Sequence, residues 1–268
     1  MNTIMMIERL AQQLVEWGFA GEVPNSRAAN LRAINNLLAG EPFYTFGIHL
    51  VEQIVGAGQL DRVQLIQLMA QACGCNDTEE FLRDPGYIGP EASAKGIFQM
   101  ATWLHEAARQ RWRVSLGTGH PGSMLGCYVR LAEWLRCKGC PIAAIPVGEM
   151  VGIDWWVDEI GGVVITSDGC GILHGHSTRS LESVLGRAAK NKGCQIDLVI
   201  GDHGYAGAAV NAELPCLSVM DTNDPALAVA AYSGATNLVV VPLYDNRPNG
   251  FTKRLADLLI EIVEGAYL

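Results

Sequence analysis

An apolar run over residues 196–201 ends in the tripeptide Asp202-His203-Gly204. A carboxylate in this position can hold a divalent cation or orient a base, and a histidine titrates near neutral pH. We therefore predict that Asp202 and His203 are catalytic and that Asp202 is also a metal ligand. A purely structural role for Asp202, as the N-cap of the next helix, is the alternative.

A second polar run, Asp221-Thr222-Asn223-Asp224-Pro225, follows an apolar stretch in the same way. An aspartate before a proline is a good helix N-cap, which explains Asp224 structurally but leaves Asp221 and Asn223 unexplained. Asp221 and Asp224 are predicted metal ligands, and Asn223 is a predicted ligand-binding residue. Asp245-Asn246 also closes an apolar stretch, although the sequence that follows is typical of a turn.

His174 and His176 are separated by one residue, so on a strand both imidazoles lie on one face. Such a pair begins a metal site or is a polar pair at a strand end, and both interpretations stay open. Asp168, in Ser167-Asp168-Gly169, is interpreted first as a turn residue because an Asp-Gly pair is a common turn signal.

The glycine-rich segment 117–123 precedes a predicted helix, so its backbone can approach an anion closely. The acidic residue that would complete a dinucleotide fingerprint is absent from the next strand end. His120 is predicted to donate to a phosphate or to act as acid or base, and a tight structural turn is the alternative. The predicted phosphate-binding residues are Gly117, Thr118, Gly119, Gly122 and Ser123.

The elements that must position these residues change in character near residue 112. Residues 1–111 show helical spacing of apolar positions, whereas residues 112–268 alternate short β-rich runs with helices. This alternation predicts an α/β fold, a mainly parallel Rossmann-like sheet with a helical N-terminal region. Loops at the carboxyl ends of parallel strands share one edge, so five polar loops are expected to converge there.

The composition of the chain argues against nucleic acid and membranes as binding partners. A net charge of −9 gives no electrostatic footprint for nucleic acid or an anionic membrane. The chain contains no apolar run of about 18 residues, and its start lacks the layout of a secretory signal, so a cytoplasmic protein is expected. The eight cysteines are expected to be reduced, with Cys137-Lys-Gly-Cys140 marking a helix end at Gly139.

Several of these segments, in order, resemble a little-characterised family labelled "phosphatase" that is best known from actinomycetes. The similarity covers most of the chain, and it implies phosphatase activity. This chain differs in being richer in cysteine and in having Tyr244 where members tend to carry an acid, which weakens Asp245 as a metal ligand. The segments that carry the resemblance are residues 30–32, 39–40, 46–47, 118–121, 167–169, 174–177, 202–209, 221–227 and 245–246.

Together these observations predict a phosphatase that uses a divalent metal, Mg²⁺, Mn²⁺ or Zn²⁺, to hydrolyse a small anionic phosphorylated metabolite. One alternative is a non-catalytic module that binds a nucleotide or sugar phosphate. Another is a metal-independent sugar-phosphate isomerase or lyase in which His120 and His203 transfer protons. The helical N-terminal region is expected to cover the site or to form a homodimer contact.

Overall fold

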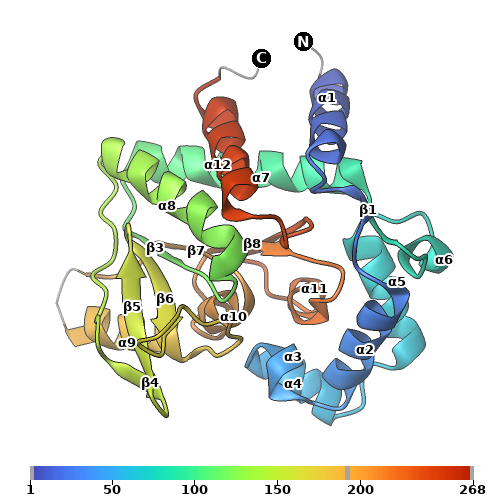
Figure 1. Ribbon diagram of the computed structural model, residues 1–268, viewed down its shortest axis with the longest axis horizontal. Coiled ribbons are helices and arrows are strands. Elements are labelled where there is room, and N and C mark those ends of the chain that lie inside the picture. The colour runs from blue at the N-terminus through green and yellow to red at the C-terminus, as the bar shows by residue number, and fades with distance from the viewer. Residues whose placement is uncertain (1–2, 191–193, 266–268) are drawn as a thin grey trace.

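A seven-stranded sheet forms the centre of the molecule (Figure 1). The computed structural model describes residues 3–190 and 194–265. The strand order is β4-β5-β6-β3-β7-β8-β9, and the five strands from β6 to β9 are parallel. The mainly parallel α/β fold predicted from the sequence is therefore confirmed. The strands of this sheet are β3 (Val114–Gly117), β4 (Met150–Gly152), β5 (Trp155–Ile160), β6 (Val163–Ser167), β7 (Leu198–Gly201), β8 (Cys216–Met220) and β9 (Leu238–Pro242).

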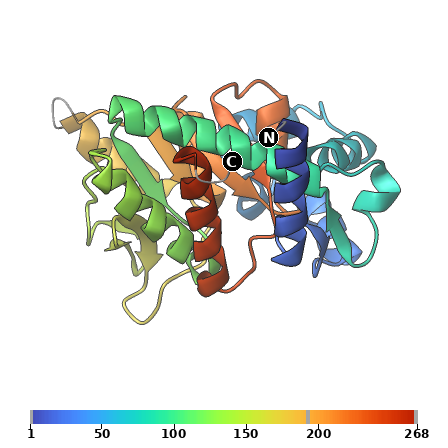
Figure 2. The same cartoon turned by 90° about the horizontal axis from the view of Figure 1, so that it is seen from above.

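Helices cover both faces of the sheet (Figures 1 and 2). One face packs into a core with α1 (Thr3–Glu16), α7 (Pro90–Gln110), α8 (Pro121–Cys137) and α12 (Asn249–Val263). The opposite face packs with α9 (Arg179–Lys190), α10 (His203–Asn211) and α11 (Pro225–Tyr232), and these are flanked by helices of the N-terminal region. Those helices are α2 (Arg27–Leu38), α3 (Pro42–Thr45), α4 (His49–Gly56), α5 (Arg62–Ala72) and α6 (Thr78–Phe81).

The direction of the crossovers determines where the sheet opens. From β3 the chain passes through α8 to β6 on one side, and from β6 it returns through α9 to β7 on the other side of β3. Because α8 and α10 then lie on opposite faces, the loops that follow β3 and β7 separate above the sheet. This reversal of strand order is where open α/β sheets place their ligands.

The elements follow from local sequence features. Strands β7 and β8 are apolar apart from the buried Ser218 and are buried throughout, as strands covered on both faces must be. Helix α8 begins with Pro121 at its first position, where the missing N–H costs nothing. Helix α5 has a capping box in which Asp61 and Gln64 bond to each other's backbone N–H.

The edge of the sheet differs from the sequence-based prediction. Residues 142–147 and 171–174 are β-rich runs whose composition predicts strands, but each forms only a single bridge, through Ile142 and Ile172. The outer strands are instead β4 and β5, which are antiparallel and whose pairing is irregular between Met150 and Gly152. These strands are half exposed, so their apolar positions do not form the continuous run that marks a buried strand.

A second, smaller sheet lies in the N-terminal region, where β1 (Gly21–Val23) pairs with β2 (Gly86–Ile88). The cysteines at all eight positions are free. Helix α8 ends at Cys137, and Gly139 follows with a φ of 82°, which confirms the predicted helix end. Among the described residues, no helix combines the length and apolarity that crossing a membrane requires.

Candidate functional site

Asp202 joins the loops that follow β3 and β7. One carboxylate oxygen accepts a hydrogen bond from the hydroxyl of Thr118 at 2.8 Å, and the other accepts one from the amide of Gly119 at 2.7 Å. The second oxygen also lies 3.0 Å from Nδ1 of His203. Although burial opposes ionisation, these partners lower the pKa of Asp202, so the carboxylate is charged at neutral pH.

His203 begins α10 with an unusual backbone. Its φ of 48° lies in the left-handed region, which residues other than glycine rarely adopt and which costs about 1–2 kcal/mol. Nδ1 faces Asp202, so Nε2 is directed toward Asp224, 3.8 Å away. Strain that the surrounding structure maintains is common where a side chain is aimed at a reaction centre.

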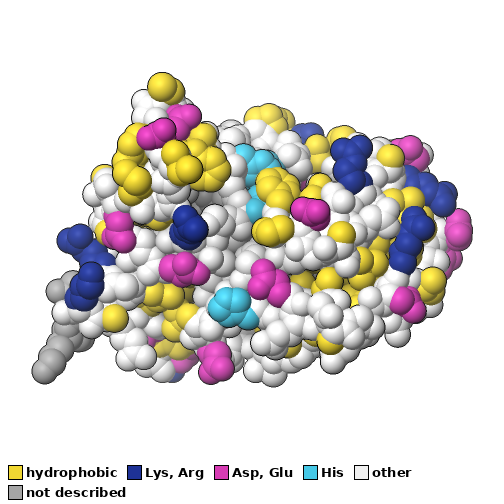
Figure 3. All heavy atoms as spheres, turned by 90° about the horizontal axis from the view of Figure 1, so that it is seen from below, with side chains coloured by type: hydrophobic (Ala, Val, Ile, Leu, Met, Phe, Trp, Pro, Cys, Tyr) yellow, Lys and Arg dark blue, Asp and Glu magenta, His cyan; other side chains and the backbone are white. Residues whose placement is uncertain are grey.

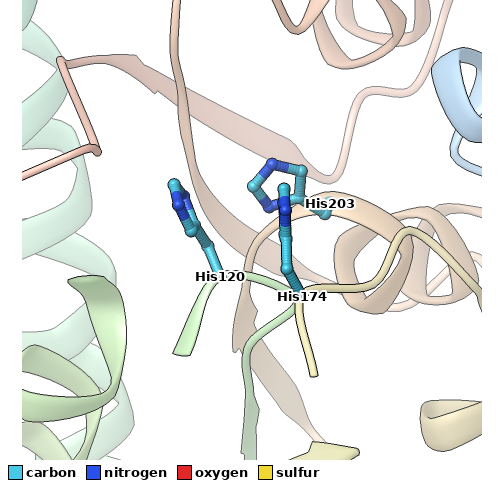
Figure 4. A group of neighbouring side chains, drawn as sticks. All are labelled: His120, His174 and His203. Carbon is cyan, nitrogen blue, oxygen red and sulfur yellow. The ribbon is translucent and has the colours of Figure 1, made fainter. Parts of the chain in front are cut away.

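Three histidines from separate loops come together (Figure 4). His120 precedes α8, His174 lies in the segment between β6 and α9, and His203 begins α10; the rings of His120 and His174 are stacked with their centres 4.7 Å apart. On one face of the molecule, histidine side chains are visible in a recess between hydrophobic side chains (Figure 3). The site is therefore open to solvent on the side of His174, which is exposed.

Buried carboxylates lie beneath these histidines. Asp221, Asp224 and Asp245 are almost completely buried at the ends of β8 and β9. The amide of Asn246 bridges two of them, donating to Asp221 at 3.2 Å and to Asp245 at 3.1 Å. Oδ2 of Asp245 lies 3.3 Å from Nδ1 of His120, but neither atom has a hydrogen-bond partner among the described residues.

The charges and the burial of these histidines and carboxylates shift one another's pKa values. Burial alone would lower the pKa of His203, but Asp224, Asp202 and Asp245 together raise it to about 10. Burial and the charge of Asp245 raise the pKa of Asp224 to about 6, although His203 acts in the opposite direction. Burial and the two neighbouring imidazoles lower the pKa of His174 to about 4. His174 is therefore neutral at pH 7 and His203 is charged.

Two overlapping sets of side chains have the spacing of a cation site. The first set is His120, His174 and His203, and the second is His203, Asp224 and Asp245. In each set the ligand atoms lie within 4.8 Å of one another. Nitrogen and oxygen ligands in this mixture suit Zn²⁺, Mn²⁺ or Fe²⁺.

The N-terminal helical region reaches the site through two asparagines. The hydroxyl of Thr222 accepts a hydrogen bond from Asn25 at 2.7 Å and donates one to Asn30 at 2.9 Å. Arg27, on the same polar face of α2, is exposed instead. Residues 30–32 are part of the family resemblance, but the sequence alone gives no partner for Asn30.

Replacing Thr222 by valine is expected to lower the free energy of unfolding by about 1–3 kcal/mol, because the change keeps the shape of a buried side chain and leaves two asparagines without their partner. Urea denaturation measures this effect. Thr102→Val is the matched control, because the hydroxyl of Thr102 is exposed and bonds only to the carbonyl of Phe98. Equal losses in the two variants would show that the link across Thr222 contributes nothing.

The residues of the predicted phosphate loop lie in different environments. Gly117 is inside β3, where an added Cβ would lie 2.4 Å from the ring of Tyr205, and Ser123 is buried with its hydroxyl on the carbonyl of Asp245. The amides of Gly119 and His120 donate to Asp202 and to the hydroxyl of Thr118. Gly122 is exposed. The loop thus holds Asp202 and His120 in place, and its binding of phosphate stays a prediction.

The remaining predicted residues are distributed around the cluster. His176 lies beside His174, with Nε2 atoms 3.1 Å apart, while its Nδ1 contacts the carbonyl of Phe43. Asn223 is half buried in its loop. The Asp168 carboxylate accepts hydrogen bonds from the amides of Cys170 and Gly171, as a turn residue does. Asp245 and Asn246 are the two site residues that sequence reasoning undervalued, although both stand where an apolar strand ends.

Comparison with known proteins identifies the family of the chain. The chain is 32% identical over 254 residues to "Phosphatase SCO2771" from Streptomyces coelicolor, a match that covers 94% of each protein. No solved structure matches the chain. Residues 5–266 match the model of a family described as "Phosphatase". From the order of its motifs and from this match over nearly its whole length, the chain belongs to that phosphatase family.

Proposed function

We propose that this protein is a divalent-metal-assisted phosphatase that hydrolyses a small phosphorylated metabolite. The observation that carries the proposal is the second set of ligand atoms, in which one imidazole and two carboxylates, all buried, lie within 4.8 Å of one another. The family and the name of the Streptomyces relative support the reaction class.

The balance of charge supports a cation at this position. Four carboxylates are buried here, and the hydrogen bonds and ion pairs of the described residues give them histidine, threonine, asparagine and backbone partners but no lysine or arginine. The pKa of Asp221 is raised well above its usual value by burial and by the charges of Asp245 and Asp224. Like charges crowded in this way favour a bound cation or a proton.

The chain's own residues divide the work. His203, Asp224 and Asp245 would hold the cation, and Nε2 of His203 would lose its proton when the cation binds. Asp202 fixes the imidazole of His203 with Nδ1 facing the carboxylate. A carboxylate behind a metal-binding histidine is the usual arrangement, because it sets both the tautomer and the orientation of the ring. When bound, a divalent cation polarises a phosphoryl oxygen and lowers the pKa of a water molecule.

His120 and His174 lie on the open side of the cluster. Nδ1 of His120 lies 3.3 Å from the Asp245 carboxylate, so its Nε2 is left for the substrate. Burial lowers the pKa of His120, but the Asp245 carboxylate outweighs this effect and raises it. His120 would therefore donate a proton to the oxygen that leaves. His174, neutral and exposed, would contact the phosphoryl oxygens.

The test is phosphate release from a panel of phosphorylated metabolites by metal-stripped protein, with Mg²⁺, Mn²⁺ or Zn²⁺ added back. We expect release to depend on the added metal and to be highest with Mn²⁺ or Zn²⁺. An Asp257→Asn variant controls for loss of a carboxylate, because Asp257 is half-buried on α12, where it pairs with Arg130 of α8. Full activity in excess chelator would contradict a role for the metal.

One observation favours a second candidate, a metal-independent isomerase or lyase. His120 and His203 each lie beside a carboxylate, and their rings are 5.4 Å apart, as a pair of proton-transfer groups requires. This candidate predicts conversion of a sugar phosphate in chelator without release of inorganic phosphate. The same assay separates the two functions.

A further inference from the structure

A pocket of about 430 Å³ lies next to the histidine cluster, between the β4–β5 hairpin and the start of α9. Its apolar side includes Trp155 and Ile153 of the hairpin, both of which are exposed at its edge. Its polar side carries hydroxyl groups, from Thr118, Thr166, Ser177 and Ser180, and the side chain of Arg179. The volume suits a small organic ligand.

The wall between the pocket and the cluster is one extended segment thick. Leu173, Gly175 and Ser177 line the pocket, whereas the alternate residues His174 and His176 belong to the cluster. Such alternation sends successive side chains to opposite sides. The base is shared as well, because Thr118 and Gly119 line the pocket and both donate to Asp202.

The charge of the pocket is opposite to that of the whole protein. The chain has a net charge of −9, yet Arg179 is the one charged residue among the described residues that line the pocket. Ser180 is nine-tenths buried and lines the pocket next to Arg179, whose guanidinium donates to the carbonyl of Val151 at 3.0 Å. A hydroxyl and a guanidinium that line the same pocket favour a ligand group that accepts hydrogen bonds and carries negative charge.

We propose that this pocket binds a second anionic group of the substrate, so that the enzyme acts on phosphomonoesters that also carry a carboxylate or another phosphate. This inference rests on the proposed function for the reaction itself. The ester phosphate lies at the histidine cluster, and the second group lies against Ser180 and Arg179. The linking part of the substrate passes over Gly175, where an added Cβ would meet nothing within 4 Å.

The experiment compares matched pairs of substrates with the metal-loaded enzyme. The pairs are 3-phosphoglycerate with glycerol 3-phosphate, and 6-phosphogluconate with sorbitol 6-phosphate; in each pair only the first member has a carboxylate. We expect kcat/KM to be about tenfold higher for the carboxylate in at least one pair, because a hydrogen bond to a charged group has this effect. Equal values in both pairs would overturn the proposal.

Variants assign the preference to the pocket. Arg179→Gln and Ser180→Ala are expected to raise KM for the preferred carboxylate substrate about tenfold. The kcat for that substrate, and both constants for the partner that lacks the carboxylate, should be unchanged within about twofold. Arg179→Lys should restore part of the preference, because it keeps the charge. Arg187→Gln, exposed on the same helix and outside the pocket, should have no effect. If Arg179→Gln or Ser180→Ala lowered kcat/KM equally for both members of a pair, the replaced residue would have a structural role alone.

A binding measurement separates failure of this proposal from failure of the proposed function. Metal-stripped protein is titrated with 6-phosphogluconate and with sorbitol 6-phosphate, and the rise in Tm is recorded with and without Arg179→Gln. A rise that is specific to the carboxylate and lost in the variant supports the pocket even if no phosphate is ever released. The absence of any difference between the two compounds would overturn the pocket and leave phosphatase activity untouched.

Discussion

Replacing Asp224 by asparagine is expected to lower kcat/KM by about a thousandfold. The substitution keeps the size of the side chain but removes one of the two carboxylates that lie within 4.8 Å of each other and of His203. We expect the purified variant to retain much less metal, as measured by elemental analysis after dialysis. Metal-free Asp224→Asn should be no less stable than the metal-free wild type, because the change relieves repulsion between buried carboxylates.

Asp202→Asn distinguishes a ligand from a positioning residue. Both oxygens of Asp202 are occupied by Thr118, Gly119 and His203, so this variant should keep its metal and lose about 10–100-fold in kcat. The roles assigned above would be wrong if Asp224→Asn kept both its metal and its activity, or if Asp202→Asn lost its metal first.

Gly119→Ala is expected to reduce kcat/KM by about a hundredfold. An added Cβ would lie 2.1 Å from the carbonyl oxygen of Gly175 and 3.0 Å from Cβ of His203. The segment that carries His174 must therefore move, or His203 must turn, and small displacements of reacting groups are costly. Steady-state kinetics measures the loss, and circular dichroism confirms that the fold is kept.

Gly122→Ala, three residues further along the same loop, is the matched control. A Cβ there would meet nothing within 4 Å, so activity should be unchanged within about twofold. Equal losses at the two positions would show that the loop tolerates no substitution at all, whereas no loss at Gly119 would show that the approach of Gly175 is not needed for catalysis.

The fold could be predicted from sequence wherever the buried residues of a helix or strand form a clear apolar pattern. The parallel strands β3, β6, β7, β8 and β9 are short, largely apolar runs, and α9 and α12, which follow β6 and β9, carry their apolar residues on one face. Strands β4 and β5 could not be predicted in this way, because a half-exposed edge strand has no strong pattern. The prolines at 141 and 146 limit pairing in the segment between them, where a strand was expected.

The site could be predicted as a set of strand ends but not as a set of contacts. Asp202 and His203 stand directly after β7, and Asp224 lies in the loop after β8, so their convergence follows from topology alone. The direction of each side chain depends on features that no strand end reveals. Two examples are the left-handed backbone of His203 and the amide of Asn246, which bridges Asp221 and Asp245. Asn246 and Asp221 are 25 residues apart in the sequence, so no local sequence pattern indicates their contact.

The irregular outer strand β4 also affects how the protein behaves at high concentration. An exposed strand edge is a template on which another chain can pair, and this is a common route to aggregation. Strand β4 is three residues long, and its pairing shifts between Met150 and Gly152. Because this edge is short and irregular, it presents few aligned N–H and C=O groups to another chain. The exposed apolar hairpin beside the pocket is thereby protected from self-association through strand pairing.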